Sequence, residues 1–175
     1  MSQDFGRELV AILPRLRRFA YGLSGSVDEG DDLVQAACER ALARTDQFAA
    51  GTRLDAWMYK ILQSIWIDRL RKRRHREIAM EQEHLENVPG GDMASEAESR
   101  LSLGEVRRAI AKLPEEQRVV LLLVSVEGLS YRDAAAVLGC PIGTVMSRLS
   151  RARLALGQAL ESRGQEIGRV IKFPR

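Results

Sequence analysis

A glycine and a proline separated by one cysteine divide two helical patterns near the end of this chain. Residues 128–153 read GLSYRDAAAVLGCPIGTVMSRLSRAR. Ser130, with Asp133 three residues later, has the capping-box arrangement that starts a helix. Gly139 suits the left-handed conformation that ends one, and Pro141 suits the first position of the next. Helix, glycine turn and helix at this length predict a helix-turn-helix, whose second helix enters the major groove in DNA-binding proteins.

The second helix of this motif is predicted to have one apolar face and one polar face. Its apolar residues recur at helical spacing, namely Ile142, Val145, Leu149 and Ala152. The candidates for contact with duplex DNA lie off that face, namely Thr144, Met146, Ser147, Arg148, Ser150, Arg151 and Arg153. Taken alone, the arginines would favour a helical hairpin with a solvated face. Their combination with the glycine turn, the proline and the serine cap favours DNA binding.

The rest of the chain is also predicted to be helical. Apolar residues between 9 and 23 repeat on one helix face, and we expect Pro14 to kink or restart that helix. Ser26 with Glu29 forms a second capping box, which opens a helix running to about Thr45. Aromatic residues make up only 5% of the chain, and β-branched residues do not alternate as in strands. The predicted fold class is therefore all-α.

A third helix is predicted to carry a basic run on a rigid rod. Its buried stripe consists of Leu54, Trp57, Met58, Ile61, Leu62 and Ile65. Trp57 is therefore interpreted as a core residue before it is considered for DNA contact. The same helix continues into Arg69–Arg76, where six of eight residues are Lys or Arg. Tyr59, Gln63 and Trp66 fall off the stripe beside Lys60 and Ser64, which predicts exposed aromatics suited to stacking on unpaired bases. A solvated charged face is the alternative for the run, although clustered cations repel one another without a polyanion.

An acidic segment separates this rod from the helix-turn-helix half. Residues 77–98 contain seven acidic residues and no Lys or Arg, and Pro89, Gly90 and Gly91 interrupt any helix there. Helical periodicity resumes at Leu101, and Pro114 ends that helix and begins another. We therefore predict two small helical domains joined by a flexible acidic linker. Their boundaries are 1–79 for the first domain, 80–97 for the linker, 98–163 for the second domain and 164–175 for a tail.

No pattern indicates catalysis, a metal site or a cofactor. Cys38 and Cys140 lack metal-ligand spacing, so we interpret them as reduced thiols of a cytoplasmic protein. No apolar stretch approaches the roughly 20 residues needed to span a bilayer, and we expect no membrane insertion. The net charge of +3 favours a polyanionic partner only weakly. An enzyme is not expected.

Two blocks of the sequence resemble a known family. LPEEQRVVLLLVSVEGLSYRDAAAVLGCPIGTVMSRLSRARLAL at 113–156 is similar to region 4 of the bacterial sigma factors of the extracytoplasmic-function (ECF) group. DDLVQAACERAL at 31–42 and LDAWMYKILQSIWIDRLRKRR at 54–74 resemble region 2 of the same group. The resemblance covers most of 5–80 and 100–157, in the expected order. It implies a subunit of RNA polymerase that directs promoter-specific initiation, with region 4 on the −35 duplex and region 2 on the melted −10 strand.

The resemblance also implies roles for individual residues. Asp31, Asp32 and Gln35 would dock on the beta-prime clamp helices of core RNA polymerase, although acidic residues at a helix start also serve as simple caps. Region 4 would meet the beta flap, and the loop 48–53 would help to hold a flipped base. A cognate anti-sigma factor is implied as a further partner. The −10 DNA-binding candidates are Phe48, Trp57, Tyr59, Lys60, Gln63, Ser64, Trp66, Arg69, Arg71, Lys72, Arg73 and Arg74.

This chain departs from the family pattern at positions expected to face DNA. In the N-terminal half, Ser64 stands at a position where the family often has asparagine, and Trp66 at one where it often has a small residue. In the second helix of the helix-turn-helix, Met146 stands where the family often has lysine or arginine, and Ser150 where it often has an aromatic residue or histidine. The promoter sequence therefore does not transfer from relatives. Two alternative functions are a sigma-like decoy that sequesters an anti-sigma factor and a stand-alone helix-turn-helix regulator. A further hypothesis is that the acidic linker mimics nucleic acid inside polymerase.

Overall fold

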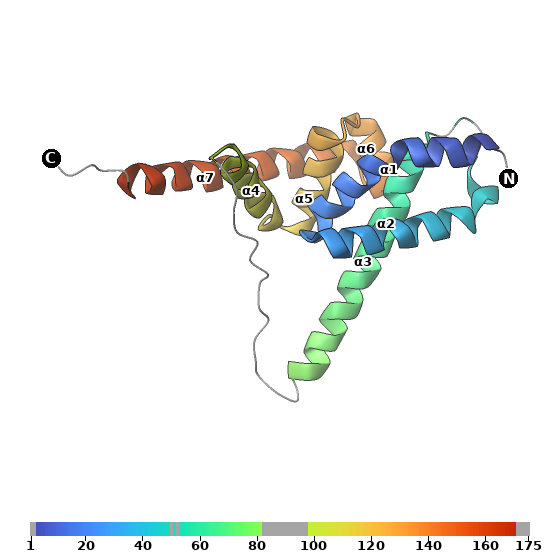
Figure 1. Ribbon diagram of the computed structural model, residues 1–175, viewed down its shortest axis with the longest axis horizontal. Helices are drawn as coiled ribbons and strands as arrows, with labels where there is room; N and C mark the ends of the chain where they lie inside the picture. The colour runs from blue at the N-terminus through green and yellow to red at the C-terminus, as the bar shows by residue number, and fades with distance from the viewer. Residues whose placement is uncertain (1–2, 50, 52, 82–97, 171–175) are drawn as a thin grey trace.

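The computed structural model describes residues 3–49, 51, 53–81 and 98–170, and these residues form helices without any strand, as predicted (Figure 1). Most of the predicted linker lies outside these ranges. None of the described helices combines the length and hydrophobicity needed to cross a bilayer. The helical elements, in chain order, are α1 (Gln3–Ser24), α2 (Val27–Leu42), a 3-10 turn η1 (Thr45–Gln47), α3 (Leu54–Glu81), α4 (Glu98–Ala111), α5 (Glu115–Leu121), a π-helical turn η2 (Leu122–Val126), α6 (Tyr131–Leu138) and α7 (Ile142–Val170).

Helices α1, α2 and α3 form the N-terminal half. The chain turns sharply at Gly25, and the Ser26 hydroxyl then accepts a hydrogen bond from the Glu29 backbone N–H at 3.4 Å, which confirms the predicted cap. The expected restart at Pro14 is wrong, because α1 continues through it. Buried apolar residues on both sides of the proline, Leu9 and Leu16, anchor the helix there. Helix α3 leaves the body of the molecule and projects away from it (Figure 1).

The C-terminal half contains the predicted helix-turn-helix. The Ser130 hydroxyl accepts from the Asp133 N–H at 3.1 Å, and Gly139 adopts a left-handed conformation with φ of 62° and ψ of 34°. Pro141 precedes α7 by one residue instead of opening it, and its carbonyl accepts from the Thr144 N–H at 2.9 Å. Helix α7 runs to Val170, past the predicted domain boundary.

The helix that starts after Pro114 changes type before it ends. Glu115 and Glu116 occupy the first turn of α5, as expected. The chain then widens into the π-helical turn η2, in which the Glu127 N–H donates to the Leu122 carbonyl at 2.9 Å. The segment from Glu115 to Val126 therefore consists of two helical types in series. The wider turn leads directly to Gly128 and the helix-turn-helix.

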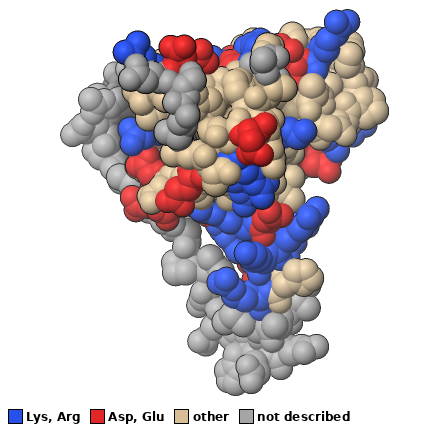
Figure 2. Space-filling view, turned by 90° about the vertical axis from the view of Figure 1, so that its right-hand side faces the viewer, with Lys and Arg blue, Asp and Glu red and all other residues tan. Residues whose placement is uncertain are grey.

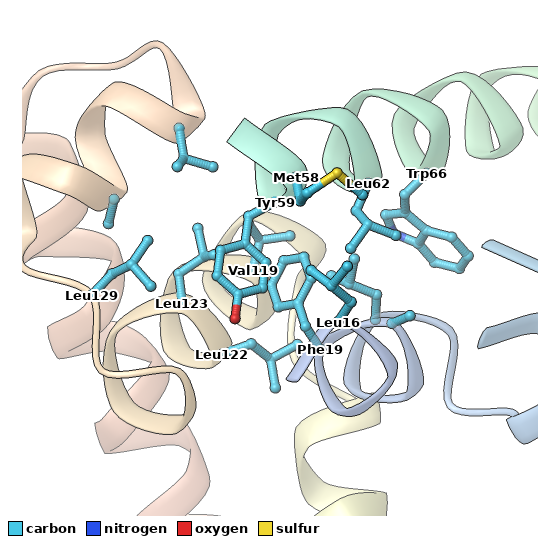
Figure 3. Close-up of a cluster of buried hydrophobic side chains, with 14 of the residues drawn as sticks. Leu16, Phe19, Met58, Tyr59, Leu62, Trp66, Val119, Leu122, Leu123 and Leu129 are labelled. Carbon is cyan, nitrogen blue, oxygen red and sulfur yellow. The ribbon is translucent and has the colours of Figure 1, made fainter. Parts of the chain in front are cut away.

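The two halves share one hydrophobic core. Five consecutive residues at 119–123, all Val or Leu, are buried, and five in a row cover every side of a helix. Helix α7 packs along α5, and α1 also contacts both α5 and η2. Figure 3 shows Leu16, Phe19, Met58 and Tyr59 of the N-terminal half facing Val119, Leu122 and Leu123. The two predicted helical units therefore meet as a single body.

Candidate nucleic-acid interface

The polar face of α7 is open to solvent. Val145, Leu149 and Ala152 are buried as predicted, which fixes the orientation of this helix in the motif. Ile142 is exposed, contrary to its predicted position on the buried face, because it is the first residue of α7 and the packing begins one turn later. Met146 is 52% exposed. The other exposed candidates on this face are Ser147, Ser150, Arg151 and Arg153.

Two α7 candidates are less available than their neighbours. Thr144 and Arg148 are half-buried. The Arg148 guanidinium forms an ion pair with Glu116 of α5 at 2.6 Å. Thr144 offers its backbone carbonyl to the Ser147 hydroxyl, which donates at 3.1 Å. In this conformation Arg148 is therefore an internal partner of α5, and a phosphate would have to displace Glu116 to reach it.

The basic run extends along α3 as a continuous helical rod, as predicted. Figure 2 shows Lys and Arg side chains gathered where this rod leaves the body. Arg69 donates to the Asp32 carbonyl at 3.2 Å, and Arg73 pairs with Glu29 while lying 5.5 Å over the Trp66 ring. These two arginines connect α3 to α2. Arg71, Lys72 and Arg74 are exposed.

The two aromatic residues expected to be exposed on α3 are buried. Tyr59 is 0% exposed and Trp66 3% exposed, so the predicted accessibility of both rings is wrong. The Tyr59 hydroxyl donates to Glu127 at 2.7 Å, and its ring meets Phe19 edge-on at 5.0 Å. Burial and the neighbouring Glu127 raise the pKa of Tyr59 far above its ordinary value. The C-terminal half covers the Tyr59 side of α3, and helical spacing alone carries no information about such a cover.

The remaining −10 candidates differ in accessibility. Lys60 and Ser64 are exposed, while Gln63 is half-buried. Phe48 and Trp57 are half-buried and pack on each other with ring centroids 5.3 Å apart. Phe5 of α1 completes this aromatic cluster. Trp57 thus packs against the hydrophobic core, as predicted from its position on the apolar stripe of α3. Positions 50 and 52 of the expected base-binding loop lie outside the described residues.

A groove of about 690 Å³ separates α3 from the helix-turn-helix half. Arg71 and Arg74 of α3 line one side, and Arg148 of α7 lines the other. Glu115 and Glu116 contribute carboxylates to the same groove. The groove therefore brings together candidate contacts to the −10 strand, Arg71 and Arg74, and a candidate contact to the −35 duplex, Arg148. The groove is lined by Gln63, Ile67, Leu70, Arg71, Arg74, Pro114, Glu115, Glu116, Val119, Leu138 and Arg148.

The polar start of α2 faces outward. Asp31 accepts from the Tyr21 hydroxyl at 2.8 Å and pairs with Arg17 at 3.2 Å. The Gln35 amide donates to Glu39 at 3.0 Å. Asp32 and Gln35 are exposed, and Asp31 is half-buried. The three predicted polymerase-binding residues therefore lie in the first half and middle of α2, and two of them, Asp32 and Gln35, are exposed.

Sequence reasoning missed a cluster of charged residues between the halves. The Glu127 side chain is 0% exposed, and it accepts hydrogen bonds from Arg18 at 2.8 and 2.9 Å and from Arg15 at 3.3 Å. Asp55 accepts from Arg15 at 3.0 Å and from Arg53 at 2.8 Å. The spacing of Arg15 and Arg18 on one helix face was the available signal. Their acceptor lies 109 or more positions away, beyond the reach of any local pattern.

The carboxyl group of Asp55 is held in its charged form. Burial by itself would raise its pKa, but hydrogen bonds from Arg53 and the Ala56 N–H, together with the positive charge of Arg53, outweigh that effect. The pKa of Asp55 therefore lies below its ordinary value. Arg53 also pairs with Asp133 of α6 at 3.1 Å, which extends the cluster to the helix-turn-helix.

An all-helical body with an exposed second helix in its helix-turn-helix and a basic rod defines a helix-turn-helix protein of the DNA-binding class. Comparison with known proteins narrows this class. Residues 103–156 match the family model described as Sigma-70, region 4, and residues 9–63 match the model described as Sigma2 domain of PhyR. Each match falls within one half of the chain.

Whole-chain relatives agree with these matches. The chain is 42% identical over 170 residues to the ECF RNA polymerase sigma factor EcfG of Rhodopseudomonas palustris, covering 95% of this chain and 90% of the relative. The sigma factor RpoE of Bartonella quintana, solved with the anti-sigma factor NepR, superposes with a TM-score of 0.77 at 37% identity, covering 91% of this chain and 98% of the other. CnrH, solved with the cytosolic domain of CnrY, gives a TM-score of 0.67 at 25% identity, covering 90% and 88%. The chain therefore belongs to the ECF family of RNA polymerase sigma factors.

Proposed function

We propose that this sigma factor binds core RNA polymerase through α2 and reads promoter DNA with α3 and α7. The observation that carries the proposal is the open polar face of α7 directly after the glycine turn. Met146, Ser147 and Ser150 offer short or flexible side chains for base edges, and Arg151 offers a cation for phosphate. A −35 duplex is the expected ligand of this face.

The N-terminal half supports the other two contacts. The acidic and amide side chains of Asp31, Asp32 and Gln35 suit a basic surface such as the polymerase clamp helices. Lys60, Ser64 and the cations of the α3 rod suit a single strand of melted −10 DNA. Tyr59 and Trp66 join this set only in a conformation that uncovers them. Their inclusion is supported by their place on α3, the helix that also carries the basic rod.

Control by an anti-sigma factor follows from the relatives. The RpoE and CnrH structures contain the anti-sigma factor NepR and the cytosolic domain of CnrY, respectively. We infer a partner of the same kind for this chain. The decoy and the stand-alone regulator are not favoured, because a family model matches each half of the chain and the relatives with the highest identity reported above are sigma factors.

In vitro transcription with core polymerase over a promoter library tests the proposal. The wild-type chain should initiate at a subset of promoters that share two elements. Arg151→Glu should lower initiation at those promoters by about tenfold or more, because it replaces a cation placed for phosphate with an anion that the DNA backbone repels. Arg107→Glu makes the same charge change on the exposed surface of α4 and should leave initiation unchanged. Absence of promoter-dependent initiation, or equal loss in both variants, would contradict the proposal.

A further inference from the structure

Arg148 is the least accessible of the arginines on the polar face of α7. Its side chain is 26% exposed, and its guanidinium pairs with the Glu116 carboxylate of α5 at 2.6 Å. Arg151 follows one helical turn later, is exposed and forms no ion pair with any of the described residues. The two arginines therefore differ in one respect that bears on DNA binding, because only Arg148 already has an anionic partner.

The Arg148 guanidinium cannot serve Glu116 and a DNA phosphate at the same time. Carboxylate and phosphate oxygens accept the same forked N–H groups of arginine, often two at once. The Glu116 carboxylate therefore occupies donors that a phosphate would need. Its negative charge also lies next to the place that the phosphate would take, and like charges at that separation repel each other. Both effects lower the affinity of α7 for duplex DNA.

The ion pair between α5 and α7 is an exposed one. The Glu116 side chain is 70% exposed, so its carboxylate stays hydrated whether or not Arg148 is bound to it. An exposed pair of this kind contributes little to the stability of a fold. The main consequence of the pair is therefore for what Arg148 can bind.

The neighbouring carboxylate has a different environment. Glu115 is half-buried, and the cations that act on its charge are Arg118 and Arg74. Both glutamates and Arg148 line the groove between α3 and the helix-turn-helix half. Among the described ion pairs, however, Arg148 is joined to Glu116 alone. Of the two acidic residues at the start of α5, Glu116 is therefore the one that controls Arg148.

We propose that Glu116 limits the affinity of this protein for duplex DNA by withholding Arg148 from the phosphate backbone. The proposal deepens the proposed function and rests on it, because it assumes that the polar face of α7 meets duplex DNA. Contacts to phosphate carry no sequence information. Withholding one of them therefore weakens binding to every duplex alike, and the base contacts of α7 supply a larger share of the affinity for a promoter.

Binding of the full chain to a fluorescent duplex of about 30 base pairs and mixed sequence tests the proposal, because phosphate contacts do not require a promoter. Glu116→Gln removes the charge and keeps the size of the side chain. It should bind this duplex about two- to fivefold more tightly than wild type, the range expected from the strength of an exposed ion pair. The logarithm of the binding constant should also fall more steeply with the logarithm of salt concentration, by about 0.9, because one further phosphate is neutralised.

Two comparisons separate the release of Arg148 from a general change in charge. Glu161→Gln makes the same substitution at an exposed position of α7, about 20 Å along the helix from Arg148. It should leave the affinity and the salt dependence unchanged, because that distance exceeds the Debye length of about 10 Å at 0.1 M salt. In an Arg148→Gln background, Glu116→Gln should lose the steeper salt dependence and most of the gain, because no guanidinium is left to release. Circular dichroism checks that each variant keeps its helices.

The outcomes distinguish this proposal from the proposed function. Equal gains in Glu116→Gln and Glu161→Gln, a gain that persists in full without Arg148, or no gain at all would overturn the role of Glu116. Arg151→Glu should weaken binding of the same duplex, because it removes a cation placed for phosphate. That loss without a gain in Glu116→Gln would uphold duplex binding by α7 and contradict the role of Glu116. A gain in Glu116→Gln with no loss in Arg151→Glu would uphold the release of Arg148 and contradict the −35 role of the α7 face.

Discussion

At the residue scale, single carboxylates with buried arginine contacts stand out from the many surface charges. Asp55 has a 10% exposed side chain and receives guanidinium groups from both Arg15 and Arg53. Asp68 pairs with Arg71 only at 4.0 Å and is half exposed. The same residue type therefore occupies two very different environments on one helix. Only the first should contribute measurably to stability.

Asp55→Asn should lower the free energy of unfolding by about 1–3 kcal/mol at pH 7, because hydrogen bonds to a charged group are lost. The pKa of Asp55 in the folded state lies below its unfolded value, so its contribution is complete above that unfolded value of about 4. It disappears as the pH falls through the lower folded pKa. The difference between wild type and Asp55→Asn should therefore shrink toward pH 3, as measured by urea unfolding.

Asp68→Asn is the matched control for this prediction. Its surface pair should contribute less than about 0.5 kcal/mol at any pH. A pH-independent deficit in Asp55→Asn, or an equal deficit in both variants, would show that the contribution of Asp55 does not come from its charge.

At the scale of the element, two glycines of the helix-turn-helix have opposite roles. Gly139 has a φ of +62° and ends α6, whereas Gly143 lies inside the first turn of α7. An added Cβ would meet no atom within 4 Å at either position. Any difference between alanine variants therefore comes from backbone conformation, and steric contact with neighbours does not contribute.

Gly139→Ala should destabilise the chain by about 1–2 kcal/mol, because a left-handed conformation is costly for a residue with a Cβ. Gly143→Ala should stabilise it by about 0.5–1 kcal/mol, because alanine loses less conformational freedom in a helix. Thermal unfolding followed by circular dichroism would measure both. The conformational account fails if the two variants shift the midpoint in the same direction.

At the scale of the whole molecule, the shared core links the stability of the two halves. Leu122 is buried against Gly22 of α1, so it belongs to the C-terminal half by sequence and to both halves by packing. Both tryptophans, Trp57 and Trp66, lie in the N-terminal half. Tryptophan fluorescence therefore reports on the N-terminal half, while far-ultraviolet circular dichroism reports on helices throughout.

The chain should unfold in one cooperative transition, with the fluorescence and dichroism curves coinciding in urea. Leu122→Ala should move both curves together by about 2–5 kcal/mol, because the cavity it leaves lies in the common core. Leu154→Ala, at an exposed position of α7, should move neither by more than about 0.5 kcal/mol. Loss of the fluorescence signal at a lower urea concentration than helicity would indicate two independently folding halves.

Local features of this fold could be predicted because their causes lie within a few residues. The Ser26 and Ser130 caps and the left-handed Gly139 each depend on contacts or torsions inside one turn of chain. Helix existence followed from periodicity, and so did the buried positions Val145 and Leu149. The α2 and α7 candidates were therefore expected on accessible faces, and most of them are.

The tertiary structure alone decided what covers each helix. Sequence periodicity showed that α3 has more than one face, but not that residues from 119 onward would cover Tyr59. The partnership of Arg15 and Arg18 with Glu127 depends on two segments more than 100 residues apart. Long-range burial is a property of the assembled surfaces, because any apolar face can be covered by any complementary one. The sequence by itself thus determined the helices and their caps, and tertiary packing determined which faces remain free to bind.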